Sequence, residues 1–132
     1  MKIGEVAERT GLSIRTIRHY DELELVVPSG RSPGGFRLYS PADVDRLLLI
    51  RRMKPLEFSL EEMRDFLRAT DLLGGAAESA AAEELADARA TVAWVREETG
   101  ARLAKLRKKV GYAEEFLGLL GTLPGAGAPD RA

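Results

Sequence analysis

The pattern of apolar and polar positions begins with two short helices. Residues 3–10 carry apolar side chains on one helical face, and Gly11 follows as a stop signal. Ser13 is predicted to be the N-cap of a second helix that ends near Leu25. The side chains predicted to face inward from this second helix are Ile14, Ile17 and Tyr20. Two helices around a glycine predict a helix-turn-helix.

Residues 31–39 are predicted to form a small β-hairpin. Pro33, Gly34 and Gly35 supply the turn, and the following four residues alternate between apolar and polar side chains. The alternation predicts that Phe36 and Leu38 face the core, whereas Arg37 and Tyr39 face outward.

Two more helices are indicated by their N-terminal caps. Ser40 is followed by Pro41 and by an acid at the third helical position, and Ser59 begins a second capping box. Each cap precedes apolar residues at helical spacing. Gly74 and Gly75 then end this unit, so a first domain is predicted over residues 1–73.

Residues 76–121 have the Ala-, Glu-, Arg- and Leu-rich composition of a long helix. Its apolar seam advances in steps of three and four residues, with two consecutive fours at Thr99 that form a stutter near Gly100. A helix of ~65 Å cannot bury such a seam alone, so we expect a homodimeric coiled coil. The predicted dimerisation residues are Leu85, Val92, Val95, Leu103, Leu106, Val110 and Leu117. Residues 122–132 are expected to be a flexible tail.

Composition and charge narrow the classes of function. The 132 residues include no cysteine, which excludes disulfides, thiolate metal sites and cysteine redox sensing by this sequence. No apolar run is long enough to span a membrane, and no signal segment begins the sequence, so we expect a cytoplasmic, nucleoid-associated protein with no membrane partner. Residues 1–56 carry ten Lys/Arg and seven Asp/Glu, a net charge of +3, whereas residues 57–132 carry ten and fourteen, a net charge of −4. That asymmetry favours a polyanionic partner for the first half.

The residues favour nucleic-acid binding over catalysis. One histidine, no cysteine and no glycine-rich phosphate loop leave no catalytic constellation, so we predict that the protein is not an enzyme and needs no cofactor or metal. The second helix has a polar outer face that could bind bases and phosphates, although a merely solvated face is the alternative. This face consists of Arg15, Thr16, Arg18 and His19. In the hairpin, Arg31, Arg37 and Tyr39 are predicted to contact the DNA backbone.

Several short motifs then resemble one family. They are Ile3-Gly4-Glu5-Val6-Ala7, Gly11-Leu12-Ser13, Thr16-Ile17-Arg18-His19-Tyr20-Asp21, Gly35-Phe36-Arg37-Leu38-Tyr39-Ser40, Asp43-Val44 and Phe58-Ser59-Leu60-Glu61-Glu62-Met63. In their order and spacing over residues 1–70, these motifs closely resemble the MerR family of bacterial transcription regulators. The resemblance implies a mainly α fold, with a winged helix-turn-helix domain followed by a long helix that forms an antiparallel coiled coil in the dimer.

The resemblance also implies a function and a set of site residues. Members of the family bind near-palindromic promoter sites and distort the DNA so that RNA polymerase can use an overlong promoter spacer. Carried over by position, the recognition helix would include Ser13, Arg15, Thr16, Arg18, His19 and Tyr20. The wing would include Arg31, Gly35, Phe36, Arg37 and Tyr39.

The sequence departs from the family pattern at three positions. Glu24 and Glu57 stand where the family usually has a glycine, and both are predicted turn positions. His19 stands where a second aromatic residue is common, which predicts an altered operator preference.

The resemblance leaves the effector open. Without cysteines, the metal- and thiol-sensing branches are not expected, and too few residues follow the long helix for a β-rich drug-sensing domain. A small organic effector, a protein partner and no effector at all therefore remain as alternatives. Trp94, Tyr112 and Phe116 are expected to pack in the dimer, with a ligand site as the other possibility. Rival functions are an architectural DNA-binding protein, an effector-free repressor and a protein-interaction coiled coil.

Overall fold

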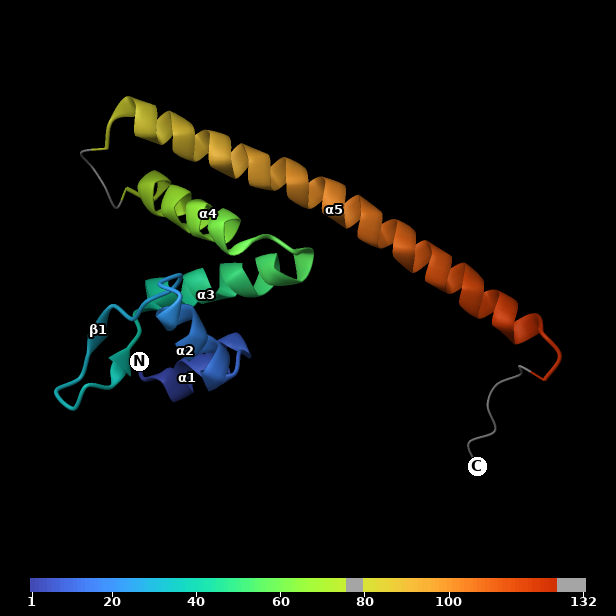
Figure 1. The fold of residues 1–132 in the computed structure, drawn as a ribbon, viewed down its shortest axis with the longest axis horizontal. Helices are drawn as coiled ribbons and strands as arrows, with labels where there is room; N and C mark the ends of the chain where they lie inside the picture. The colour runs from blue at the N-terminus through green and yellow to red at the C-terminus, as the bar shows by residue number, and fades with distance from the viewer. Residues whose placement is uncertain (76–79, 126–132) are drawn as a thin grey trace. The chain divides into compact units, whose positions relative to one another are not determined.

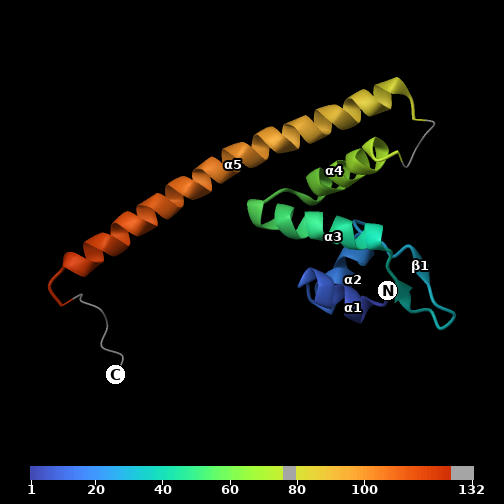
Figure 2. The same cartoon turned by 180° about the vertical axis from the view of Figure 1, so that it is seen from behind.

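The computed structural model describes residues 1–75 and 80–125, and the chain divides into two units, residues 1–93 and 94–132. Within the described residues, helices dominate, and two short strands form a hairpin (Figures 1 and 2). In chain order the elements are α1 (Ile3–Thr10), α2 (Ile14–Glu22), β1 (Gly30–Arg31), β2 (Arg37–Leu38), α3 (Pro41–Met53), η1 (Lys54–Leu56), α4 (Leu60–Leu73) and α5 (Ala82–Thr122).

The helix-turn-helix is formed by α1 and α2. Gly11 ends α1 in the left-handed region, at φ 72°, and its N–H donates to the carbonyl of Ala7. Ser13 is the N-cap of α2, as the sequence predicts. The helix ends at Glu22, three residues earlier than predicted, because the chain reverses there and buries Leu25.

The wing is a two-stranded antiparallel hairpin that the N-terminus joins. Arg31 pairs with Arg37 across the strands, and Lys2 forms a further antiparallel bridge with Leu38. The N-terminal ammonium donates to the carbonyl of Tyr39 at 2.8 Å, and the first residues therefore lie beside β2 (Figure 1).

The helices α3 and α4 supply much of the core of the first unit. Both begin with the predicted capping boxes, at Ser40 and Ser59. The largest side chains buried in this unit come from α1, α2, α3 and α4, from the residue after β2 and from the turn after α2. They include Val6, Ile17, Val26, Tyr39, Leu47, Ile50 and Met63.

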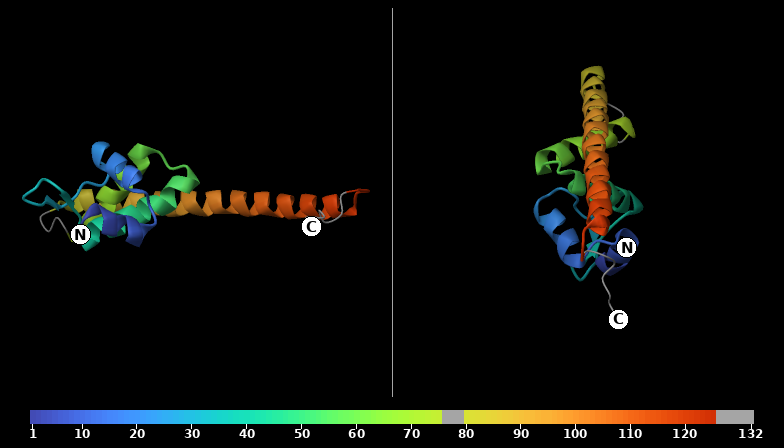
Figure 3. Two further views of the ribbon diagram at one scale, coloured as in Figure 1. Left: turned by 90° about the horizontal axis from the view of Figure 1, so that it is seen from below. Right: turned by 90° about the vertical axis from the view of Figure 1, so that its right-hand side faces the viewer.

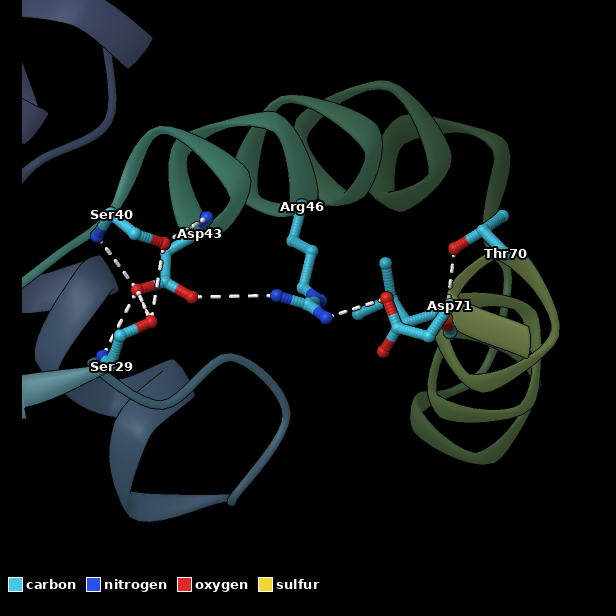
Figure 4. A network of polar contacts seen from close by, with 7 residues as sticks. Ser29, Ser40, Asp43, Arg46, Thr70 and Asp71 are labelled. Atoms are coloured by element: carbon cyan, nitrogen blue, oxygen red, sulfur yellow. Dashed lines mark hydrogen bonds and ion pairs between the residues drawn. The ribbon is translucent and has the colours of Figure 1, made fainter. Parts of the chain in front are cut away.

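A polar network joins the start of the wing to α3 and α4 (Figure 4). Asp43 is buried, and one of its carboxylate oxygens accepts from the Ser29 backbone N–H at 3.0 Å and from the Ser29 hydroxyl at 2.6 Å. The same oxygen accepts from the Ser40 backbone N–H at 2.9 Å. Arg46 links Asp43 to Asp71 of α4. Every bond of the Asp43 carboxylate is therefore made inside the domain, which explains how a charged group is buried there.

The long helix α5 runs without interruption through Gly100 and Gly111 (Figure 3). Its described start, Ala82, is later than the predicted residue 76, and residues 76–79 lie outside the described chain. Its end at Thr122 is one residue beyond the predicted end. The expected flexible tail, residues 122–132, falls mostly outside the described residues, and the division into domains at residues 73 and 76 stays a prediction.

Candidate nucleic-acid interface

The start of α2 is held by a pair of side-chain hydrogen bonds. The Ser13 Oγ accepts from the backbone N–H of Thr16 at 3.0 Å and lies 2.8 Å from the Thr16 Oγ1. The cap thus satisfies one of the unpaired N–H groups of the helix start. It also fixes two of the predicted site residues to each other on the exposed side of the chain.

The two sides of α2 separate core residues from cationic residues. Ile17 is completely buried and Tyr20 is 6% exposed, whereas Arg15, Arg18 and His19 are exposed. Tyr20 lies three residues after Ile17 and therefore on the same helical face. The inward direction predicted from its spacing is confirmed, so Tyr20 belongs to α2 but its ring lies in the core rather than on the outer face. Burial raises the pKa of the Tyr20 hydroxyl.

The wing turn is built around Ser32 and Gly35. Gly35 has φ 80°, and its N–H donates to the carbonyl of Ser32 at 2.8 Å. The Ser32 N–H in turn donates to the carbonyl of Phe36 at 2.9 Å, which closes the hairpin. A glycine adopts the left-handed backbone at this position without strain, so the sequence placed the turn correctly.

The predicted alternation of the wing side chains is wrong at both ends. Phe36 was expected to face the core but is 64% exposed, and Tyr39 was expected to face DNA but is 2% exposed. The reason is that β2 contains two residues, too few for the alternation to extend to its neighbours. Tyr39 follows the strand, where its backbone bonds to Met1 and its ring enters the core.

Tyr39 therefore cannot donate to a phosphate in this conformation. Its hydroxyl is buried and has no hydrogen-bond partner among the described residues. Burial, and next the nearby charge of Asp21, raise the pKa of this hydroxyl.

The two wing arginines meet a carboxylate of α2. The Nε of Arg37 donates to the Asp21 Oδ2 at 2.6 Å, and the Nη2 of Arg31 lies 3.5 Å from the same oxygen. The hydrogen bond to Asp21 raises the pKa of the Arg37 guanidinium. The Arg31 Nη1 also donates to the Gly35 carbonyl at 3.4 Å. Arg37, predicted to point freely outward, is thus partly engaged within the protein, with 27% of its side chain exposed.

Two open hollows flank the outer face of α2. One, of about 930 Å³, is lined by α2 side chains that include Arg15, Arg18 and His19 and by Lys54 of η1. The other, of about 360 Å³, lies between α1, Arg18 and the wing, where the Lys2 Nζ stands 5.6 Å from the centre of the Phe36 ring. Cations therefore line both sides of the outer face of α2.

Sequence reasoning missed Lys54 and Lys2. Lys54 lies 32 residues beyond the end of α2, and a lysine before a proline carries no signal of DNA contact. Lys2 is brought to the wing by the bridge between the N-terminus and β2. Both placements depend on contacts between distant segments, which no local pattern encodes.

The predicted dimerisation residues behave differently along α5. Val95 is buried within the single chain, and Leu85 and Val92 are half-buried. Leu103, Leu106, Val110 and Leu117 are exposed, at between 41% and 71%. In the described part of the chain no three His, Asp or Glu side chains are arranged to hold a metal ion. No described helix has the length and apolar content needed to cross a membrane.

Comparison with known proteins decides the family. A family model described as "MerR HTH family regulatory protein" matches residues 1–70. The chain belongs to the MerR family. The family consists of DNA-binding transcriptional regulators, and the relatives that match this chain are regulators and not enzymes.

Two of the most similar curated relatives are much longer than this chain. It is 36% identical over 115 residues to the transcriptional activator TipA of Streptomyces coelicolor, an alignment that covers 87% of this chain and 40% of TipA. It is 46% identical over 66 residues to the transcriptional activator mta of Bacillus subtilis, covering 50% of this chain and 26% of mta. The chain thus spans less than half the length of these two relatives.

Solved structures of MerR regulators share the fold. The MerR-family regulator HiNmlR, described as lacking the sensor domain and solved bound to promoter DNA, superposes with a TM-score of 0.69 at 21% identity, covering 89% of this chain and 86% of that one. The regulator PbrR691 of Ralstonia metallidurans, solved in complex with lead(II), has a TM-score of 0.52 at 29% identity, with 86% of each chain covered. These likenesses agree with the predicted fold class, a winged helix-turn-helix followed by a long helix.

Proposed function

We propose that this protein binds a near-palindromic promoter operator as a homodimer and changes the conformation of the promoter DNA. The observation that carries the proposal is the outer face of α2, where Arg15, Arg18 and His19 are exposed beside Lys54. A recognition helix enters the major groove with such side chains, because Arg reads guanine edges and Lys binds phosphates. The wing, with exposed Phe36 and Arg31, then contacts the neighbouring backbone.

The second unit supports the homodimer. Four apolar residues of the predicted seam, Leu103, Leu106, Val110 and Leu117, remain exposed on one stripe of α5. A large exposed apolar stripe on a regular helix is typical of a protein–protein interface. An antiparallel pair of these helices buries both stripes and holds two recognition helices at a fixed spacing.

Promoter distortion follows from that fixed spacing. A dimer whose two recognition helices do not match the half-site spacing of straight DNA must bend or untwist the operator, at a cost of order 1–6 kcal/mol. The distortion then brings the two promoter elements into the register that RNA polymerase requires. We propose that neither a metal nor a thiol triggers this step, since these 132 residues contain no cysteine. A small organic effector or a protein partner is the trigger, or the dimer deforms DNA constitutively.

DNA binding and dimerisation are tested together by selection. The purified protein enriches duplexes from a random-sequence pool, and the enriched sequence is expected to contain two inverted half-sites. The affinity for that duplex should fall steeply with salt, as phosphate contacts require. Sedimentation of the complex should give two chains per duplex. One chain per duplex, or chains that assemble head to tail, would favour an architectural DNA-binding protein instead.

Distortion is tested by transcription. The native promoter is compared with a promoter whose spacer is shortened by two base pairs. Activation of the native promoter alone supports untwisting. Equal activation of both would indicate simple recruitment of RNA polymerase, and repression of both would indicate an effector-free repressor.

A further inference from the structure

A nearly buried carboxylate lies on the helix that carries the DNA-binding face. The side chain of Asp21 is 12% exposed, and α2 presents Arg15, Arg18 and His19, together with Glu22, to solvent. An anion near a surface that approaches phosphates weakens binding through its charge. The contacts of Asp21 must therefore favour DNA binding in another way, which offsets this loss of affinity.

Those contacts join α2 to both strands of the wing. The Asp21 Oδ2 is 2.6 Å from the Nε of Arg37 on β2 and 3.5 Å from the Nη2 of Arg31 on β1. Arg31 and Arg37 are paired directly across the strands. Like charges in that position repel each other and destabilise a hairpin, and the carboxylate between them removes the repulsion.

The geometry leaves Arg37 able to bind a second anion. Asp21 engages the Nε–H, whereas four of the five N–H donors of a guanidinium are on its two terminal nitrogens. A guanidinium whose Nε–H is already bonded has lost much of its rotational freedom. When a phosphate binds its terminal nitrogens, the side chain therefore loses less conformational entropy. The bond from Arg31 to the Gly35 carbonyl fixes the turn of the wing in the same way.

We propose that Asp21 is a positioning residue for operator recognition: it holds Arg31 and Arg37, and with them the wing, in a fixed register relative to α2. The operator then contacts the outer face of α2 and the wing at the same time, which increases the affinity for the correct sequence more than for others. Asp21 itself does not touch DNA. This inference rests on the proposed function and adds a residue that determines specificity.

The two effects of Asp21, positioning of the wing and repulsion of phosphates, predict opposite changes in the affinity of the Asp21→Asn variant for the selected duplex. Loss of the negative charge alone strengthens binding to every DNA sequence. Loss of positioning instead weakens binding to the selected duplex, while binding to a scrambled duplex is unchanged or stronger. We expect the ratio of the two affinities to fall about tenfold, the effect of one lost charge-assisted hydrogen bond.

The matched control is Glu22→Gln. It removes the same charge one residue further on, from a side chain that is 70% exposed and whose carboxylate lies 3.9 Å from His19 rather than at the wing. This variant should strengthen binding to both duplexes by a similar factor and leave their ratio unchanged. Both variants and the unaltered protein are measured on the duplex selected by the unaltered protein and on its scrambled form, over a range of salt concentrations.

A second pair of variants keeps the inference testable. In a protein with Arg31→Gln and Arg37→Gln, the further change Asp21→Asn should have no effect on the affinity ratio, because the groups it positions are gone. If Asp21→Asn alone is unfolded at the assay temperature by circular dichroism, the double arginine variant must itself lower the ratio. An unchanged ratio in the folded Asp21→Asn protein, or in the double arginine variant, would overturn the inference. Failure of the unaltered protein to enrich any sequence would instead contradict the proposed function.

Discussion

Residues 1–93 and the described part of residues 94–132 differ in how far their apolar side chains are buried. In the first unit, Ile17, Leu47 and Ile50 are completely buried by contacts within the chain. In the second, Leu106 is 42% exposed and Leu117 is 71% exposed. The first unit therefore has a closed core, whereas the second has a regular helix with an unburied stripe.

The difference shows what each unit requires in order to be stable. A closed core is stabilised by its own apolar burial, at roughly 25 cal/mol for each Å² removed from water. An isolated helix gains little stability from the helix propensity of its residues, and most helical stability in proteins comes from packing of an apolar face. We therefore expect changes in the first unit to act on folding and changes in the second to act on assembly.

The largest effect should come from a charge on the exposed stripe. Leu106→Asp places an unpaired carboxylate at the proposed helix–helix contact, at a cost of roughly 3–5 kcal/mol for each buried charge. The variant should be monomeric by light scattering and lose tight operator binding. Ala104→Asp is the control, because Ala104 is exposed and lies away from the stripe. If both variants stay dimeric, the stripe is not the interface.

A cavity in the closed core should come next. Leu47→Ala removes a fully buried side chain of α3 and should lower the free energy of unfolding by about 2–5 kcal/mol. Chemical denaturation measures this loss. Light scattering under native conditions should still find the dimer, because α5 is unchanged. Loss of the dimer together with the stability would mean that the two units are not independent.

Removal of a cation from the surface that we propose to bind DNA should have a smaller effect, which depends on the DNA sequence. Arg18→Ala should cost about 1–3 kcal/mol on the selected operator and relax the base preference at one position of each half-site. Lys54→Ala should weaken selected and random duplexes alike and reduce the salt dependence by about one unit. Gel-shift titrations over a range of salt concentrations separate the two. Equal losses on every sequence for both variants would contradict this division of roles.

The smallest effect concerns two glutamates with a glycine-like backbone. Glu24 and Glu57 have φ of 56° and 65°, the left-handed region that favours glycine, at the two positions where the family usually has one. Glu24→Gly and Glu57→Gly should each raise the free energy of unfolding, by about 0.5–1 kcal/mol. Glu8→Gly, within α1, should lower it by about 1 kcal/mol. Thermal unfolding measures all three, and a loss of stability in the first two would contradict the expected relief of strain.

The same two glutamates show how a departure from a family pattern can be interpreted. Substitution of a glycine could have meant that the turn itself had changed. The described structure keeps the left-handed turn at both positions and places a strained side chain there. The backbone path is set by the packing on either side, since Leu25 and Phe58, which follow the two glutamates, are both buried.

The sequence by itself determined the local features of this protein. Ser13, Ser40 and Ser59 begin the helices that their spacing predicts, and Gly35 lies in the wing turn. Caps and tight turns depend on residues within a few positions of one another, so a short segment contains the whole signal. The cationic outer face of α2 also followed from helical spacing alone.

Only the tertiary structure decided which side chains of the wing and the N-terminus lie beside the outer face of α2. It buried Tyr39, exposed Phe36, paired Asp21 with two arginines and brought Lys54 beside α2. Each of these outcomes depends on segments that are distant in sequence. A two-residue strand has too short a pattern to fix its neighbours, so their directions were set by packing against the rest of the unit.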